Sequence, residues 1–148
     1  MALPRERVTL ITLGVRDMDR AQAFYSNWGW RAHPGSPPGL VLFQMNGMAL
    51  ALFDRESLAE DQNVAVEKLG TGAVTLAQNC ADGAEVDAVF SAALDAGATL
   101  LKAPEAVFWG GYSGYFADPD GHVWEIAHNP SWPLGEDGSL VLPNAPAE

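Results

Sequence analysis

The sequence predicts an α+β fold in which two βαβββ modules form paired curved sheets around a cavity. Two observations lead to this prediction: strand and helix patterns recur in the same order in both halves of the chain, and each half ends in a hairpin signal. The residues that start the two predicted helices, Asp17 and Asp82, lie about 65 positions apart, and the two hairpin turns lie about 74 positions apart. The length of 148 residues fits one domain.

The domain is predicted to span residues 1–129, with modules at about 7–54 and 72–129. Residues 55–71 form an acidic linker, in which Ser57 and Glu60 have the spacing that caps a short helix. Residues 130–148 form a proline-rich tail. We expect this tail to be extended or partly disordered, because proline supports neither helix interiors nor sheet ladders.

In the first module, residues 8–15 form an apolar, β-branched run that predicts a strand. Asp17 has the position of a helix N-cap, and Gly29 supplies the left-handed residue that ends the helix. Strands at residues 40–44 and 48–53 flank Asn46 and Gly47, a pair typical of type I′ turns, in which both central residues take positive φ. Helical spacing predicts an inward face formed by Ala21, Phe24, Tyr25 and Trp28.

The second module repeats this order. Residues 73–77 predict a strand, Asp82 and Glu85 predict a capping box, and Gly97 ends the helix. Strands are predicted at residues 99–101, 112–117 and 122–127. The last two flank a type I turn at residues 118–121, with proline at its second position and glycine at its fourth. The inward helical face is predicted to gather Val86, Val89, Phe90, Ala93 and Leu94.

Charge is distributed unevenly along the chain. The net charge is −11, composed of +2 in residues 1–55 and −13 in residues 56–148. Such a field repels phosphate backbones and argues against a nucleic-acid partner, whereas it attracts a cationic ligand.

No apolar stretch approaches the roughly 20 residues that span a bilayer, so no membrane partner is expected. A single cysteine, Cys80, excludes an intrachain disulfide, and together with the absence of a signal-peptide pattern it predicts a cytoplasmic protein.

Two motifs carry a family resemblance. The first is Leu13-Gly-Val-Arg-Asp17, followed by Phe24-Tyr25 and Gly29-Trp30; the second is Gly114-Tyr-Phe-Ala-Asp-Pro-Asp-Gly-His-Val-Trp-Glu-Ile-Ala-His-Asn-Pro130. The chain resembles the vicinal oxygen chelate superfamily over about residues 7–129. This group includes glyoxalase I, bleomycin-resistance proteins, fosfomycin-resistance enzymes and extradiol dioxygenases. The resemblance implies a glyoxalase-like fold around a small-molecule cavity and a homodimer, but it leaves the chemistry open.

The resemblance also implies where a metal would bind. Relatives that use a divalent ion draw one ligand from the first and one from the last strand of each module. At these positions the present chain has Leu10, Ala51, Ala73 and Glu125. Since a metal site of this kind needs about three protein donors and hydrocarbon donates none, the sequence predicts no metal site and no cofactor. A divalent metal held by a changed ligand set that includes Glu125 is the disfavoured alternative.

The histidines offer no evident replacement for these ligands. His33 lies in a loop rich in proline and glycine, His122 follows a turn, and His128 lies three residues beyond Glu125. On a strand, this odd spacing places His128 and Glu125 on opposite faces. We therefore expect surface or turn roles for all three.

Glu125 is the only catalytic candidate, and the catalytic residues are otherwise unknown. If its strand follows the family pattern, it points into the cavity, where an unpaired carboxylate is costly. It could bind a cationic ligand, act as a general base, or form an internal hydrogen bond. Aromatic residues near it would line the cavity or else pack into the core. The candidate ligand-binding set is Glu125, Trp109, Tyr112, Tyr115, Trp30 and Phe53.

The leading functional prediction is a metal-independent small-molecule binder of the bleomycin-resistance type, with a cationic or aromatic ligand. The alternatives are a metal-dependent lyase or dioxygenase, and an interaction module with a filled cavity. Ser113 does not lie in a nucleophile-elbow motif, and no phosphate-binding loop is present. Whether the protein is an enzyme is therefore left open by the sequence.

Overall fold

The computed structural model describes residues 3–144 and contains seven strands and three α-helices. The strands are β1 (Leu10–Val15), β2 (Leu40–Gln44), β3 (Ala49–Asp54), β4 (Thr75–Asn79), β5 (Thr99–Ala106), β6 (Tyr112–Ala117) and β7 (Val123–His128). The helices are α1 (Met18–Trp28), α2 (Arg55–Gln62) and α3 (Gly83–Asp95), with a short 3-10 turn, η1 (Val66–Lys68).

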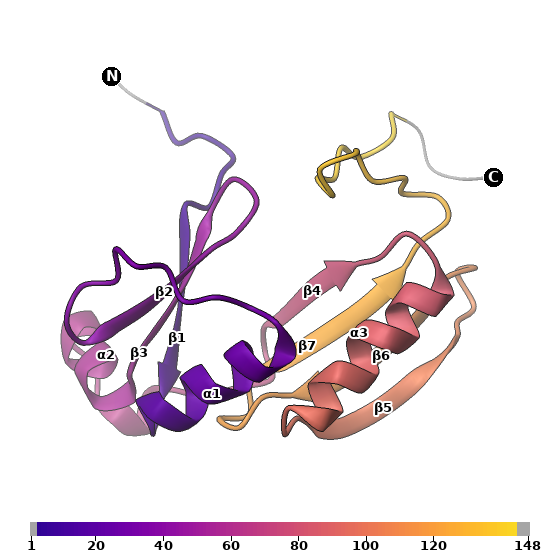
Figure 1. Ribbon diagram of the computed structural model, residues 1–148. Coiled ribbons are helices and arrows are strands. Elements are labelled where there is room, and N and C mark those ends of the chain that lie inside the picture. Colours follow the sequence, from indigo (N-terminus) through magenta and orange to yellow (C-terminus); the bar gives the residue numbers. More distant parts are fainter. Residues whose placement is uncertain (1–2, 145–148) are drawn as a thin grey trace.

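The strands form two separate sheets, in agreement with the predicted α+β fold (Figure 1). The first has the order β1-β3-β2 and the second the order β4-β7-β6-β5. In each sheet the first strand of the module pairs in parallel with its last strand, β1 with β3 and β4 with β7. This shared topology is the internal repeat that the sequence predicts.

The first module has one strand fewer than the predicted βαβββ unit. Between α1 and β2 the chain forms a loop, and its one ladder-like contact is the His33 amide donating to the Leu42 carbonyl at 2.7 Å. Pro34, Pro37 and Pro38 follow, and proline has no N–H to donate to a sheet. A fourth strand therefore cannot continue along β2.

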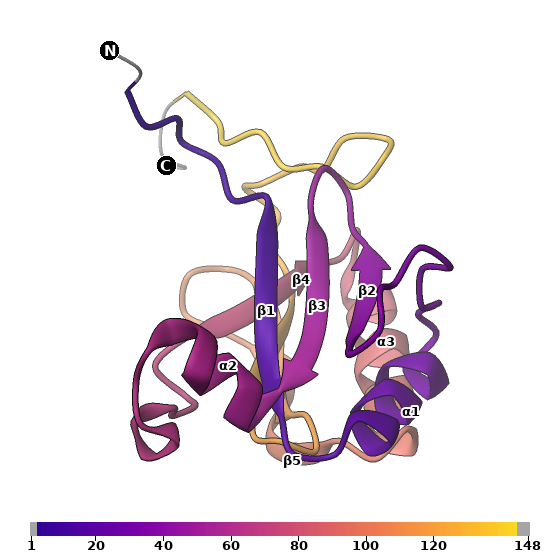
Figure 2. The ribbon, with the colours of Figure 1, turned by 90° about the vertical axis from the view of Figure 1, so that its left-hand side faces the viewer.

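The predicted linker contains α2, but its cap differs from the prediction. Asp54, not Ser57, is the N-cap, and its Oδ2 accepts bonds from the Ser57 amide at 2.9 Å and the Ser57 hydroxyl at 3.0 Å. α2 packs on the first sheet at Gly14, where a Cβ would lie 3.1 Å from the Leu58 side chain. Figure 2 shows this sheet from its outer side, with α1 at its lower right.

The hairpin between β2 and β3 forms as predicted, with the Met45 amide donating to the Met48 carbonyl at 2.8 Å. The turn is not type I′, however. Gly47 has φ 76°, whereas Asn46 is not among the described residues with positive φ. The Asn46 side chain instead donates to the Asp137 carbonyl at 3.0 Å, which joins the hairpin to the C-terminal segment.

The C-terminal segment is only partly extended. A bridge pairs Leu134 with Leu140 in antiparallel fashion. Pro146, which belongs to the predicted tail, lies outside the described residues.

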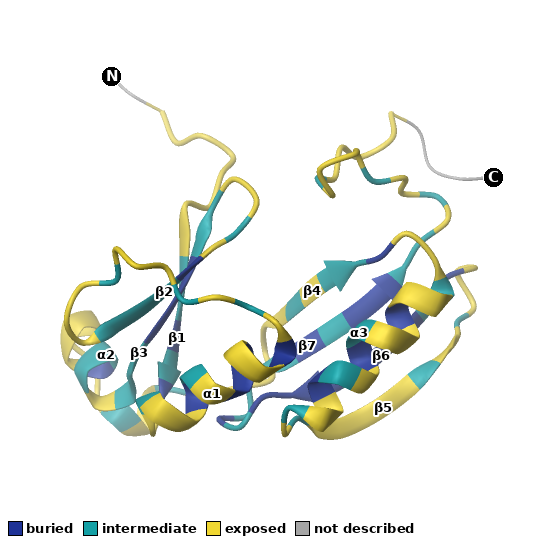
Figure 3. Ribbon diagram, viewed as in Figure 1, coloured by how far each residue is buried: buried dark blue, intermediate teal, exposed yellow. Residues whose placement is uncertain are grey.

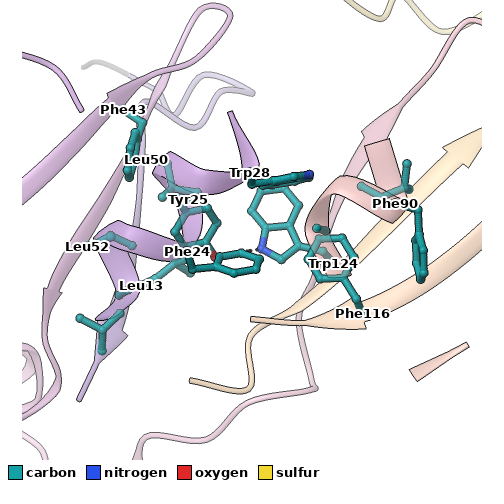
Figure 4. Packing of buried hydrophobic residues seen from close by; sticks show 14 of the residues in the cluster. Leu13, Phe24, Tyr25, Trp28, Phe43, Leu50, Leu52, Phe90, Phe116 and Trp124 are labelled. Atoms are coloured by element: carbon teal, nitrogen blue, oxygen red, sulfur yellow. Dashed lines mark hydrogen bonds between the residues drawn. The ribbon is translucent and has the colours of Figure 1, made fainter. Parts of the chain in front are cut away.

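The core lies between the two sheets and contains the inward faces of α1 and α3 (Figure 3). Phe24 and Trp28 of α1 face Phe116 of β6, with ring centroids 6.2 Å and 5.4 Å apart. α1 therefore packs against both modules, although it belongs to the first (Figure 4). The other faces of both sheets carry neither α1 nor α3, and we call them the outer faces.

A buried polar cluster, which we call the Asp118 clamp, joins the turn at residues 118–121 to the first module. The Tyr25 hydroxyl donates to Asp118 Oδ2 at 2.6 Å and accepts from Trp124 Nε1 at 3.1 Å. Asp118 Oδ1 accepts the amides of Asp120 and His122, each at 2.9 Å. Burial, followed by the nearby Asp118 charge, raises the pKa of Tyr25, so its hydroxyl stays a donor.

Asp120 extends this connection to the start of α1. Its Oδ1 accepts the Arg16 amide at 2.8 Å and lies 3.3 Å from the Arg20 guanidinium. The Asp-Pro-Asp-Gly motif therefore holds the modules together, in addition to forming a turn.

Candidate functional site

Glu125 and Tyr115 meet on the outer face of the second sheet. Strand alternation sends Trp124 and Ile126 into the core and Glu125 to the opposite face. Register places Glu125 beside Tyr115 of β6, and the Tyr115 hydroxyl donates to Glu125 Oε2 at 3.0 Å. Both side chains are half-buried. Glu125 does point opposite to Trp124 and Ile126, as alternation requires, but the predicted direction is wrong. Trp124 and Ile126 face the core and Trp124 lines the space between the sheets, whereas Glu125 lies on the outer face.

This pairing leaves Glu125 able to bind a further donor. Burial is the first cause that raises the pKa of Tyr115, and the hydrogen bond to Glu125 and its negative charge add to it. Tyr115 therefore remains protonated and donates to one carboxylate oxygen. Within the described residues, Oε1 of Glu125 has no hydrogen-bond partner. Its neighbour in register on β4 is Ala77, which offers only a methyl group.

The donor set does not fit the divalent metal found in relatives. Register and distance from the helix cap make Thr75, not Ala73, the counterpart of Leu10, because each is the first residue of its strand. Ala51 and Glu125 are equivalent in the same way, since they pair with Thr12 and Ala77. In the described part of the chain, no three His, Cys, Asp or Glu side chains come together as a ligand set.

The remaining aromatic candidates do not join Glu125. Tyr112 faces α3, where its hydroxyl donates to Asp87 at 2.6 Å. Trp109 lies in the loop between β5 and β6 and is 41% exposed. Phe53 lies on the outer face of the first sheet, and Trp30 lies between the two sheets.

The three histidines form separate contacts with backbone groups. His122 Nε2 lies 2.8 Å from the Gly14 carbonyl, which adds to the connection between the modules. His128 Nδ1 lies 3.1 Å from the Cys80 carbonyl, and His33 Nδ1 accepts the Gly35 amide at 3.0 Å. These contacts agree with the predicted turn and surface roles.

A second candidate region lies between the two sheets, where the sequence predicts a cavity. A cavity of about 720 Å³ lies between the two sheets and is lined by Trp30, Phe43, Gln78 and Trp124, among others. Trp124 and Gln78 lie on the face of the second sheet opposite to Glu125. The sequence predicts the cavity and selects Trp30, but it does not select Phe43, Gln78 or Trp124, because their place in the lining depends on how the two sheets pack.

The Cys80 thiol is expected to react slowly. Burial, followed by the charges of Glu85 and Asp82, raises its pKa from 9.0 to about 11. Alkylation by iodoacetamide at pH 8 should therefore be slow in the folded protein and fast in urea, and the folded rate should climb toward pH 11. Because the fold favours the neutral thiol, the associated stability is complete below pH 9 and declines between pH 9 and 11. Equal rates at pH 8 with and without urea would contradict this.

Comparison with known proteins identifies the class to which this fold and site belong. The model of the Glyoxalase/Bleomycin resistance protein/Dioxygenase superfamily matches residues 7–126, and the chain belongs to this family. A solved glyoxalase-related enzyme from Fulvimarina pelagi is 39% identical, with a TM-score of 0.85. The similarity covers 93% of this chain and 99% of that one. A lactoylglutathione lyase from Agrobacterium tumefaciens is 26% identical, with a TM-score of 0.66, over 87% of this chain and 98% of that one.

Curated relatives match a shorter stretch. An uncharacterised protein from Mycobacterium bovis is 36% identical over 97 residues, which are 63% of this chain. The matched region spans 61% of that relative's own length. Within the described residues of the present chain, no helix has both the length and the apolar character needed to cross a bilayer.

Proposed function

We propose that this protein is a metal-independent small-molecule binder of the bleomycin-resistance kind, which takes an aromatic cation at the outer face around Glu125. The observation that supports it is the Glu125 carboxylate, which has one oxygen held by Tyr115 and one without a partner in the described chain. A half-buried carboxylate with a free oxygen is best satisfied by a cationic donor. The charge of −13 in residues 56–148 adds a long-range electrostatic attraction for the same cationic ligand.

We further propose that the working form is a cytoplasmic homodimer. β5 is an edge strand, and its Leu100 and Leu101 are 52% and 53% exposed. Phe108, in the loop that follows, is fully exposed. A second copy that covered this edge would bury apolar surface and would also close the open face around Glu125. Sedimentation equilibrium at micromolar concentration should give twice the chain mass of 15.8 kDa, and a single chain mass would contradict the dimer.

The binding proposal is tested by replacing Glu125 with glutamine, which keeps the shape and removes the charge. We expect Glu125→Gln to weaken binding of 2-naphthylmethylammonium about fivefold, because a half-exposed ion pair contributes about 1 kcal/mol. Calorimetric titration in the presence of a chelator measures this change.

The matched control is Glu67→Gln, an exposed carboxylate on η1 that should leave the affinity unchanged. Binding of the neutral analogue 2-naphthylmethanol should be the same in the wild type and in Glu125→Gln. Equal weakening by the two Glu→Gln changes would reduce the effect to net charge and would contradict a site at Glu125.

The second candidate function is a metal-dependent lyase or dioxygenase that uses Glu125 in a changed ligand set. The likeness to a lactoylglutathione lyase over 87% of this chain is the observation in its favour. Elemental analysis of protein purified without chelator distinguishes the two. Stoichiometric metal, or turnover restored by Ni²⁺, Zn²⁺, Mn²⁺ or Fe²⁺, would favour the enzyme over the binder.

A further inference from the structure

The cavity between the sheets is separate from the outer face around Glu125. β1 and β3 contribute Ile11 and Leu50 on one side, and β4 contributes Leu76 and Gln78 on the other. The hairpin between β2 and β3 and the C-terminal Gly138 border it. Neither Glu125 nor Tyr115 lines it, although the lining reaches around the edge strand β4 to Ala77, the register neighbour of Glu125. A volume of about 720 Å³ lies within the range of small-molecule sites in proteins.

Aromatic rings form one wall of this cavity. Trp30 stacks on Tyr25 with centroids 5.1 Å apart and planes at 23°. Trp30 also contacts Trp124 and Phe43 edge to face, each at 5.5 Å. Trp30 is only half-buried although four rings, those of Tyr25, Trp28, Phe43 and Trp124, pack on it, so part of the ring is open to the cavity. Such a surface favours a flat aromatic partner.

Polar side chains at the rim of the cavity indicate which polar groups a bound ligand would have. Gln78 is half-buried on the Trp124 side of β4, and its side-chain amide has no hydrogen-bond partner within the described residues. A free amide offers one acceptor and two donors. Arg31 is the one ionised side chain that lines the cavity in the described chain, and no carboxylate does so. In a protein of net charge −11, the charge nearest this cavity is therefore positive, which favours an anionic group on the ligand.

We propose that this cavity is a second ligand site, which binds a planar aromatic molecule with a hydrogen-bonding edge and one negative group. The ring lies against Trp30 and Trp124, the edge pairs with the Gln78 amide, and the anion lies toward Arg31. Its preference for charge is opposite to that of the Glu125 face, so the two sites are separable by experiment. Met45 and Met48 at the rim have flexible side chains that adapt to different ring systems.

The tryptophan indoles provide a direct test with the unaltered chain. The protein has five tryptophans, so a ¹H–¹⁵N correlation spectrum gives five indole signals, which single Trp→Phe variants assign. The probe is 2-naphthoate, a flat ring system with one carboxylate. We expect saturable shifts of the Trp30 and Trp124 signals, with the exposed Trp109 signal unmoved. Shifts at Trp109 alone, or no saturable shift at all, would overturn the proposal.

Two variants locate the ligand within the cavity. Gln78→Phe fills the space beside Trp124 and should weaken naphthoate binding about tenfold, since the added ring occupies the ligand's volume. Arg31→Gln should weaken naphthoate about threefold, as expected for an exposed ion pair, and leave neutral 2-naphthamide unchanged. Glu67→Gln, at an exposed carboxylate that does not line the cavity, is the matched control and should affect neither probe.

The outcomes separate this site from the proposed function. Loss of naphthoate binding in Glu125→Gln would place the ligand on the outer face and would contradict the cavity. Unchanged naphthoate affinity in a folded Gln78→Phe variant would do the same. If Gln78→Phe does not fold, the indole shifts of the wild-type protein decide. Failure of 2-naphthylmethylammonium to bind would affect only the Glu125 proposal.

Discussion

Replacing Asp118 with alanine is expected to lower the free energy of unfolding by about 3 kcal/mol, because it leaves buried donors without partners. Asp118 is 2% exposed and accepts three hydrogen bonds, from the Tyr25 hydroxyl and from the amides of Asp120 and His122. The loss affects both modules, since Tyr25 belongs to α1 and Asp118 to the turn after β6. Urea denaturation followed by circular dichroism measures the change.

Two further variants test whether the loss of stability comes from the hydrogen bonds of Asp118. Asp95→Ala, at the exposed end of α3, removes the same side chain from a position without hydrogen bonds in the described chain and should change stability by less than about 0.5 kcal/mol. Tyr25→Phe should cost about 1–2 kcal/mol, since it leaves one Asp118 oxygen and the Trp124 indole unpaired. If Asp118→Ala costs no more than Asp95→Ala, the Asp118 clamp does not hold the modules together.

Replacing Phe24 with alanine is expected to cost about 3–5 kcal/mol, the range for deleting a buried aromatic ring. Phe24 is 2% exposed and lies 4.9 Å from Tyr25 and 6.2 Å from Phe116, measured between ring centroids. Its ring therefore fills space between α1 of the first module and β6 of the second. The free energy of unfolding in urea again provides the measurement.

The matched control for this change is Phe108→Ala. Phe108 is fully exposed in the loop between β5 and β6, so its removal should change stability by less than about 0.5 kcal/mol. A small effect at Phe24 would show that α1 does not pack against the second module. A large effect at Phe108 would instead indicate that a second copy covers this loop.

The helices of the two modules were predictable because their signals are local. Asp17 and Asp82 accept from the amides of Arg20 and Glu85, as N-cap residues do. Glu85 accepts the amide of Ala81 at 2.6 Å, so its return bond goes to the residue before the N-cap and not to Asp82 as in the predicted capping box. The inward residue Phe24 follows from helical spacing alone and lies in the core.

Features that depend on distant residues were not predictable. Asn46 and Gly47 mark a hairpin, but the contact of Asn46 with Asp137, 91 positions away, accompanies a different turn type. The first module lacks a strand because prolines interrupt the segment between α1 and β2. The repeat of elements between the two modules predicts a strand there all the same. The lining of the cavity between the sheets depends on the position of the two sheets relative to each other, and long-range packing determines that position.

The candidate site was predicted in part. Strand alternation correctly separates Glu125 from Trp124, and register then adds Tyr115. Tyr112 lies three positions before Tyr115, and the same alternation places it on the opposite face, against α3. The grouping of Trp30 with Glu125 was a guess about a shared cavity, and the structure places the two on different faces.

The central claim, binding without a metal, is tested most directly by titrating 2-naphthylmethylammonium into chelator-treated protein and into protein supplied with Ni²⁺, Zn²⁺, Mn²⁺ or Fe²⁺. The proposed mode of binding predicts the same dissociation constant in every case, because a carboxylate and a phenol hold the ligand. The four positions where relatives have metal ligands carry Leu10, Ala51, Thr75 and Glu125, which offer too few donors for a divalent ion. Binding that appears only when a divalent ion is present, and disappears on chelation, would contradict it.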